Sequence, residues 1–293
     1  MSMIILVLIL VLPLLFIGVI NKFKAKFAGK QGASIFQQYY DFAKLIKKGQ
    51  VISNVTSFVF QIAPTINLAC VIIATILLIC TDFSGNFIMF AYLLGLGKFF
   101  NVIAAMDTGS SFEGMGAARE VSYTSFVENA FFIVIGSLAA FSHIYTFDAL
   151  FETLHLNNEI GVLIHLLIIC MLFMMIIIEG SRIPVDDPKT HLELTMIHEV
   201  MILDNSGVDL AFIHYTNALK MLLFTALISF MIFGTSVLGF LLTFLVIAFL
   251  IACVEAFGAR IRLTHIIEYS YTMMCIALTV MALILLSIYG GLK

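Results

Sequence analysis

Long apolar segments dominate this sequence and constrain its fold more than any other feature. A helix that spans a bilayer needs roughly 20 mostly apolar residues, and about eight stretches of the chain meet that requirement. A transmembrane barrel is disfavoured because its strands run only about 10 residues. The sequence therefore predicts an all-α polytopic membrane protein with cytoplasmic loops, in which 1–293 form a single transmembrane domain. The predicted spans are Met3–Ile20, Phe58–Cys80, Phe87–Met106, Phe126–Tyr145, Ile160–Glu179, Ala218–Phe233, Val237–Phe257 and Tyr269–Tyr289.

The composition supports this fold class. Hydrophobic residues make up 62% of the chain and charged residues only 11%, whereas soluble domains carry about 25% charged residues. This balance, with a net charge of −3, excludes a soluble enzyme and a nucleic-acid binder, which needs a basic surface. All five cysteines lie in apolar runs and none forms a C-x-x-C pair, so we expect no metal site and no iron–sulfur cluster in this chain.

Basic residues alternate between the two sides of the predicted bundle. The loop Asn21–Ser57 holds seven lysines, and three later loops on the same side carry arginine. The opposite loops contain acidic residues but neither lysine nor arginine. By the positive-inside rule, the basic loops are cytoplasmic and both termini lie outside.

Several ionisable residues lie within or at the ends of the predicted spans, where charge is costly and tends to mark ion pathways or buried pairs. One interpretation is a proton half-channel formed by the cluster, since apolar surroundings raise carboxylate pKa values and nearby arginines lower them. The other is a set of interfacial side chains and structural ion pairs. Lys98 lies mid-span and requires a carboxylate or carbonyl partner. The candidates are Lys98, Arg119, Glu120, Glu128, Glu179, Arg182, Lys220, Glu255, Arg260 and Arg262.

The third cytoplasmic loop contains a predicted helix. Asp187 followed by Pro188 is typical of a helix start, with the aspartate as cap and the proline in the first turn. We expect this helix to reach about Leu203. Glu193 then lies against an apolar stripe, and Asp204 lies close to the same angle if the helix extends that far.

A glycine cluster precedes the fourth predicted span. Gly109, Gly114 and Gly116 are not followed by the Gly-Lys-Ser/Thr of a phosphate-binding loop. We therefore interpret the cluster as a tight polar turn that leads into the helix.

A longer pattern resembles a known family. The order of Glu179, Arg182, Pro184, Asp186, Glu193 and then Ser206-Gly207 resembles the signature of the respiratory-chain NADH dehydrogenase subunit 1 family, a membrane component of complex I. The stretch from Asp107 to Glu120 is closer to one branch, the membrane anchors of formate hydrogenlyase and related group 4 NiFe-hydrogenases. Further positions that match this branch are Gln37, Asp41, Lys44, Glu128, Glu255, Arg260 and Arg262.

The resemblance implies a non-catalytic membrane subunit of a bacterial or archaeal cell membrane. Its partners would be hydrogenase-like large and small subunits and antiporter-like membrane subunits, with the Fe–S clusters and the NiFe centre in those partners. The chain would anchor the cytoplasmic electron-transfer arm and couple redox change to proton movement. The implied proton path is Glu128, Glu179, Glu193 and Glu255, with Arg119, Glu120, Arg182, Asp186, Arg260 and Arg262 ordering the loops by ion pairs. Lys98, Asp204 and Lys220 are further candidates.

Three alternatives stay open. The chain could form part of the quinone chamber of an NADH–quinone oxidoreductase, although Lys189 and His191 stand where that family carries acidic residues, which weakens a quinone site. It could also be a free-standing ion transporter, which the lack of a visible internal repeat disfavours. A purely structural anchor without a proton path is the third.

Overall fold

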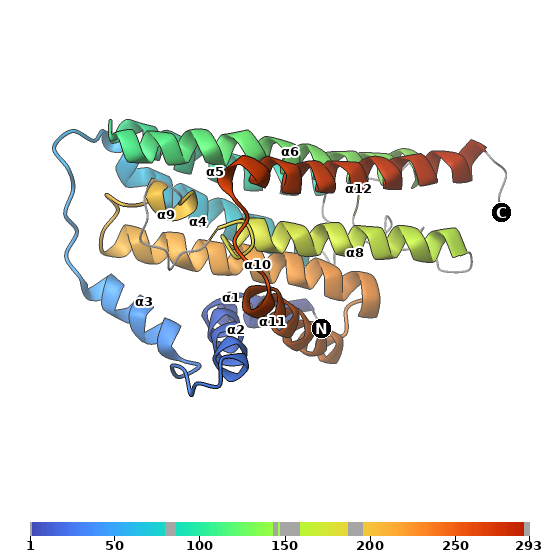
Figure 1. Cartoon of the computed structure of the whole chain (residues 1–293), viewed down its shortest axis with the longest axis horizontal. Coiled ribbons are helices and arrows are strands. Elements are labelled where there is room, and N and C mark those ends of the chain that lie inside the picture. Colours follow the sequence, from blue (N-terminus) through green and yellow to red (C-terminus); the bar gives the residue numbers. More distant parts are fainter. Residues whose placement is uncertain (1, 80–85, 143–145, 147–158, 187–195, 290–293) are drawn as a thin grey trace.

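Helices make up the fold of the part of the chain that the structure describes. This computed structural model describes residues 2–79, 86–142, 146, 159–186 and 196–289 (Figure 1). The helices are α1 Ser2–Val11, α2 Pro13–Phe27, α3 Gln37–Lys47, α4 Phe58–Ile79, α5 Phe87–Asp107, α6 Ser111–Ser142, α8 Glu159–Glu179, α9 His198–Met201, α10 Val208–Phe233, α11 Val237–Phe257 and α12 Leu263–Tyr289.

The predicted all-α polytopic fold is confirmed. Among the described residues, 7 helices are long and apolar enough to cross a membrane, and the bent pair α1 and α2 gives an eighth span if it is counted as one. The sixth span was predicted to begin at Ala218, but α10 starts at Val208. Polar residues lie in α10 before Ala218, and they hid the start of this helix. The last span likewise starts at Leu263 and not at Tyr269.

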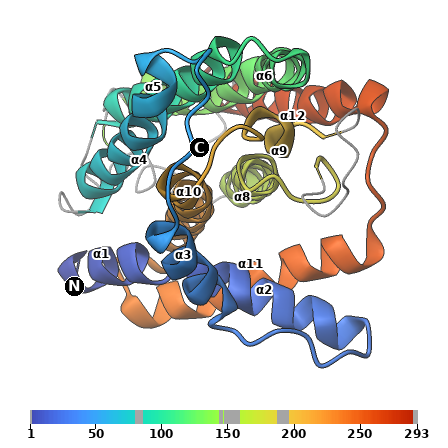
Figure 2. The same ribbon diagram turned by 90° about the vertical axis from the view of Figure 1, so that its left-hand side faces the viewer.

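The helices form three layers, seen along the bundle in Figure 2. One outer layer contains α4, α5, α6 and α12, and the opposite one contains α1, α2 and α11. Between them lie α8 and α10, and α10 packs against α2, α4, α8 and α11. In both views α2 and α11 run across the long axis of the bundle, whereas α6, α8, α10 and α12 run along it. The central position of α10 places its polar residues in the protein interior.

The first span is broken, which corrects the prediction of one helix over Met3–Ile20. α1 and α2 meet at an angle of 60°, because Pro13 lacks a backbone N–H and begins a new helix. The end of α1 therefore needs other hydrogen-bond donors for its carbonyls. The hydroxyl of Tyr39 on α3 donates to the Val11 carbonyl, and that of Tyr215 on α10 donates to the Leu10 carbonyl at 2.6 Å.

We expect Tyr215→Phe to destabilise the protein. The substitution keeps the ring but leaves the Leu10 carbonyl without its donor, a loss of about 1 kcal/mol for a typical hydrogen bond. Thermal unfolding in detergent measures the effect. Tyr271→Phe, which alters an exposed ring on α12, is the matched control. Equal melting temperatures for the two variants would contradict this role of the hydroxyl.

The fourth span also starts earlier than predicted. α6 begins at Ser111 instead of Phe126, so Gly114 and Gly116 lie inside a helix and only Gly109, with a φ of +66°, lies in the turn. Gly116 is required by packing: a Cβ there would lie 2.4 Å from Cγ1 of Val200 and 3.0 Å from the carbonyl oxygen of Ile197. The glycine therefore allows the segment around α9 to lie directly on α6.

Candidate functional site: a buried charge cluster between two cavities

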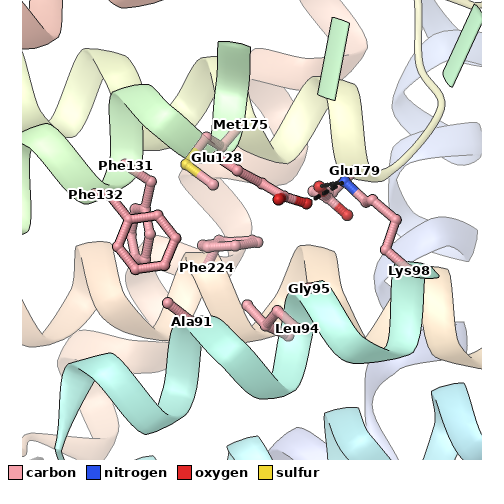
Figure 3. A pocket seen from close by; sticks show the side chains of 10 residues that line it. All are labelled: Ala91, Leu94, Gly95, Lys98, Glu128, Phe131, Phe132, Met175, Glu179 and Phe224. Atoms are coloured by element: carbon pink, nitrogen blue, oxygen red, sulfur yellow. Dashed lines mark hydrogen bonds and ion pairs between the residues drawn. The ribbon is translucent and has the colours of Figure 1, made fainter. Parts of the chain in front are cut away.

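Helices α5, α6, α8 and α10 bring four charged side chains together, three of which are drawn in Figure 3. Glu179, the last residue of α8, accepts a hydrogen bond from Lys98 of α5 on one carboxylate oxygen. Its other oxygen lies 3.4 Å from Nζ of Lys220 on α10. Nζ of Lys98 also lies 3.9 Å from a carboxylate oxygen of Glu128 on α6. We call Lys98, Glu128, Glu179 and Lys220 the central cluster; it supplies the carboxylate partner that Lys98 requires.

The members of the central cluster differ in burial. The side chains of Lys98, Glu179 and Lys220 are 12%, 9% and 5% exposed, whereas that of Glu128 is 42% exposed. Two buried cations flank the Glu179 carboxylate and stabilise its charged form. Removing this carboxylate would leave both lysines without a neutralising partner. Glu128 has the weaker pairing and the greater exposure, so it is the member best placed to exchange a proton. Glu120 lies nearby and accepts a hydrogen bond from the Tyr123 hydroxyl at 2.9 Å.

Glu255 belongs to a second, separate set of ion pairs. Its carboxylate lies 2.8 Å from Lys24 of α2 and 3.1 Å from Arg182, which follows α8. No ion pair between described residues joins it to the central cluster. The pairing with Lys24 was not predicted, because the two residues are far apart in sequence. This geometry ties the transverse helices α2 and α11 to the loop after α8.

Asp186 positions α9. Its carboxylate accepts hydrogen bonds from the backbone N–H of Ile197 at 3.2 Å and of His198 at 3.0 Å, and it pairs with Arg260 at 3.2 Å. Arg119 holds the same segment from α6 by donating to the Met196 carbonyl at 2.9 Å. Three parts of the chain, namely α6 and the loops after α8 and α11, therefore converge on the start of a helix of 4 residues.

The prediction of one helix from Asp187 to Leu203 is wrong where the structure can test it. Residues 196–197 and 202–204 are not helical, and only His198–Met201 form α9. Asp186 accepts hydrogen bonds from the N–H groups at the start of α9, so a residue brought in by the fold caps this helix. Residues 187–195, including Glu193, lie outside the described residues, so the predicted place of Glu193 in a proton path stays a prediction.

Two further sequence candidates lie at the surface, and one buried acid was missed. Asp204 and Arg262 are exposed, and Asp204 is held through its backbone N–H, which donates to Glu113 at 2.9 Å. Glu113 on α6 is fully buried, and its other carboxylate oxygen has no partner among the described residues. Sequence reasoning missed it because this stretch was interpreted as a turn.

Three cavities lie at or near the central cluster. The first, of about 220 Å³, is enclosed by α2, α3, α9 and α10 and is lined by Arg182, Glu199 and His214 among others. A second, of about 20 Å³, adjoins Glu120 and Lys220. A third, of about 30 Å³, is the one drawn in Figure 3 and is lined by Lys98, Glu128 and Glu179. A space of about 10–15 Å³ suffices for one water molecule, so each has room for water.

Glu199 titrates near neutrality in this environment. Its burial, and secondarily the negative charge of Asp186, raises the pKa of Glu199 from 4.5 to about 7. Between pH 4.5 and about pH 7, Glu199 therefore binds more protons in the folded protein than in the unfolded chain. Its contribution to the free energy of unfolding falls as the pH rises through this interval.

We expect Glu199→Gln to remove this contribution, because glutamine does not ionise. Unfolding of the wild type and the variant, measured from about pH 5 to about pH 8, tests the prediction, and the wild type should lose more stability over this interval. Curves that stay parallel would contradict it.

The fold and the site define a polytopic membrane protein with buried ion pairs next to internal cavities. A family model described as NADH dehydrogenase matches residues 1–287. The chain belongs to this family, which confirms the resemblance to the membrane component of complex I that the sequence motifs indicated.

Relatives agree with the branch expected from the sequence. The chain is 28% identical over 235 residues to hydrogenase-4 component C of Escherichia coli (strain K12), covering 75% of this chain and 71% of that protein. It is 33% identical over 129 residues to formate hydrogenlyase subunit 4 of the same organism, covering 42% of each chain. A chain of the membrane-bound sulfane sulfur reductase, an archaeal respiratory membrane complex, shares the fold with a TM-score of 0.79 at 17% identity, over 97% of this chain and 98% of that one.

Proposed function

We propose that this chain is the membrane subunit that anchors the electron-transfer arm of a complex I-like respiratory or hydrogenase complex and couples its redox chemistry to proton translocation. The family and its hydrogenase-4 and formate hydrogenlyase relatives support a complex I-like membrane subunit. The observation that carries the coupling role is the central cluster. Ionisable groups within a membrane span are costly unless they are paired or serve ion transfer. Glu128, half exposed beside Lys98, lines both the cavity of about 30 Å³ in Figure 3 and a pocket of about 240 Å³ between α5 and α6.

The proposal includes partners and an orientation. The loop between α8 and α10 faces the cytoplasm of a bacterial or archaeal cell and contacts hydrogenase-like large and small subunits, which hold the Fe–S clusters and the NiFe centre. Antiporter-like subunits lie beside the bundle in the membrane, and both termini lie outside. Extraction of the tagged chain in mild detergent, followed by mass spectrometry, tests this set of partners. Flavin- and NADH-binding partners would instead indicate complex I.

A quinone fits the cavity beside Glu199 poorly. Its volume of about 220 Å³ is below the 300–1,000 Å³ that is usual for ligand pockets. Here the lining includes Arg182, His198, Glu199 and His214. We therefore assign this cavity to water and protons and route no step through a quinone.

Proton translocation by the purified complex in vesicles tests the coupling role. We expect Glu128→Gln to keep redox turnover but to lower the protons moved per electron at least ~10-fold, because an amide cannot take part in acid–base transfer. Glu268→Gln, at an exposed position on α12, is the matched control.

Three outcomes would argue against the proposal. A wild-type complex that turns over without moving protons would contradict coupling, and full coupling in Glu128→Gln would contradict the role of the central cluster. Ion transport by this chain alone would support a free-standing transporter.

A further inference from the structure

A thin polar wall separates the large polar cavity from the small cavity beside the central cluster. Ser181, His198 and Asn217 line both cavities. They come from three places in the chain: the loop just after α8, the first residue of α9, and the middle of α10. On one side of the wall lies Glu199, and on the other lie Glu179 and Lys220. Any proton that passes between the two cavities by way of this wall has to pass one of these three side chains.

His198 is the member of the wall that can both accept and release a proton. Its Nε2 lies 2.6 Å from Nδ2 of Asn217. Because an amide nitrogen only donates, Nε2 is the acceptor in this contact and the ring proton lies on Nδ1. Serine and asparagine side chains do not change protonation state at physiological pH. The imidazole is therefore the one group in the wall suited to proton transfer.

The surroundings keep His198 neutral. Burial lowers the pKa of His198 to about 4, against the opposing attraction of Asp186. Lys220 on α10 and Lys98 on α5 lower it further, and Glu179 on α8 raises it. A neutral ring offers one acceptor and one donor nitrogen, as a relay requires.

We propose that His198 carries protons across this wall, from the polar cavity at Glu199 into the small cavity beside the central cluster. The inference rests on the proposed coupling function and names the entry of its proton path. A proton released from the Glu199 carboxyl reaches the ring through cavity water and forms an N–H bond at Nε2. The N–H bond at Nδ1 then breaks, and its proton passes to an acceptor in the small cavity. One proton moves and no electron is transferred. The ring is neutral again with its proton on Nε2, and a turn of the ring restores the starting arrangement before the next proton.

Asn217 is the positioning residue for this step. Its amide can donate to Nε2 when the ring is neutral, and after turning over it can accept from Nε2–H when the ring is charged. Asp186 fixes the backbone of His198 from the other side. The ring is thus held at the wall in both protonation states.

The test uses the whole complex in vesicles, with proton translocation and redox turnover measured together. We expect His198→Gln to lower proton translocation about 100-fold, the lower end of the effect of a positioned acid–base group. Glutamine can still bond to Asn217, so a merely structural role would leave coupling intact. In His198→Ala, imidazole added to the buffer should restore translocation, and N-methylacetamide should not.

Matched variants separate this inference from the proposed function. His265→Gln, at an exposed histidine of α12, should couple as the wild type does. Full coupling in His198→Gln, or no rescue of His198→Ala by imidazole, overturns the role of His198. If coupling is intact in His198→Gln but lost in Glu128→Gln, the proposed function stands without a role for His198. A wild-type complex that moves no protons overturns both the proposed function and this inference.

Discussion

Replacing Glu179 by leucine is expected to lower the free energy of unfolding by about 3–5 kcal/mol, the cost of breaking a buried ion pair from one side. The reason is geometric: both oxygens of this carboxylate face a lysine, and those lysines are 12% and 5% exposed. Once the acid is gone, Lys98 keeps only the looser contact with Glu128, and Lys220 loses its carboxylate. Unfolding of the purified protein in mixed detergent micelles measures the loss.

Two further variants decide whether the loss comes from stranded charge. Glu128→Leu removes the other carboxylate beside Lys98, but at 3.9 Å and 42% exposure it should cost much less. Combining Glu179→Leu with Lys98→Met and Lys220→Met should recover most of the stability, since an apolar replacement of a whole buried cluster is often neutral. A triple variant as unstable as Glu179→Leu would show that volume, and not charge, sets the cost.

Replacing Asp186 by alanine is the second large effect that we expect. The substitution removes two hydrogen bonds from backbone N–H groups to a charged acceptor, each worth about 1.5–3 kcal/mol, together with the pair to Arg260. α9 should then open locally, and amide hydrogen exchange at Ile197 and His198 should increase at least ~100-fold, since about 1.4 kcal/mol is tenfold.

The control for this prediction is Asp41→Ala, since Asp41 lies on α3 with a long contact of 4.0 Å to Lys44. It should leave exchange at α9 unchanged. Unaltered protection of Ile197 in Asp186→Ala would show that Arg119 and Gly116 suffice to hold the segment. Because His198 lies at the start of α9, the same variant should also reduce proton coupling.

The sequence predicted the membrane-spanning fold well because hydrophobic length is a local property. The spans between Phe58 and Phe257 were found from their apolar runs. The errors arose where polar residues lie inside helices: the starts of α6 and α10 carry Glu113 and Asp209, and a search for apolar runs stops there. The bend at Pro13 was missed for a different reason, since the surrounding residues are uniformly apolar.

The candidate site was predicted as a set of residues but not as a set of contacts. The sequence named Lys98, Glu179 and Lys220, yet 81 positions separate the first pair and 41 the second, so only the fold could pair them. The predicted helix was wrong at residues 196–197, where the carboxylate of Asp186 binds the backbone N–H groups of Ile197 and His198 by a tertiary contact. His198 and Asn217 were beyond prediction as a pair, since a lone histidine and a lone asparagine carry no motif.

Because α2 and α11 run across the long axis of the bundle, we expect the stability of this protein to depend on the length of the lipid acyl chains around it. A helix that crosses the bundle obliquely spans less of the hydrocarbon than an upright one, and the 15 residues of α2 extend only about 22 Å. Bilayers adapt to short or inclined spans by local thinning, at a cost that grows with each ångström of mismatch. Acyl chains of increasing length should therefore strain the corner of the bundle that Lys24 and Glu255 hold together, before they affect the upright helices.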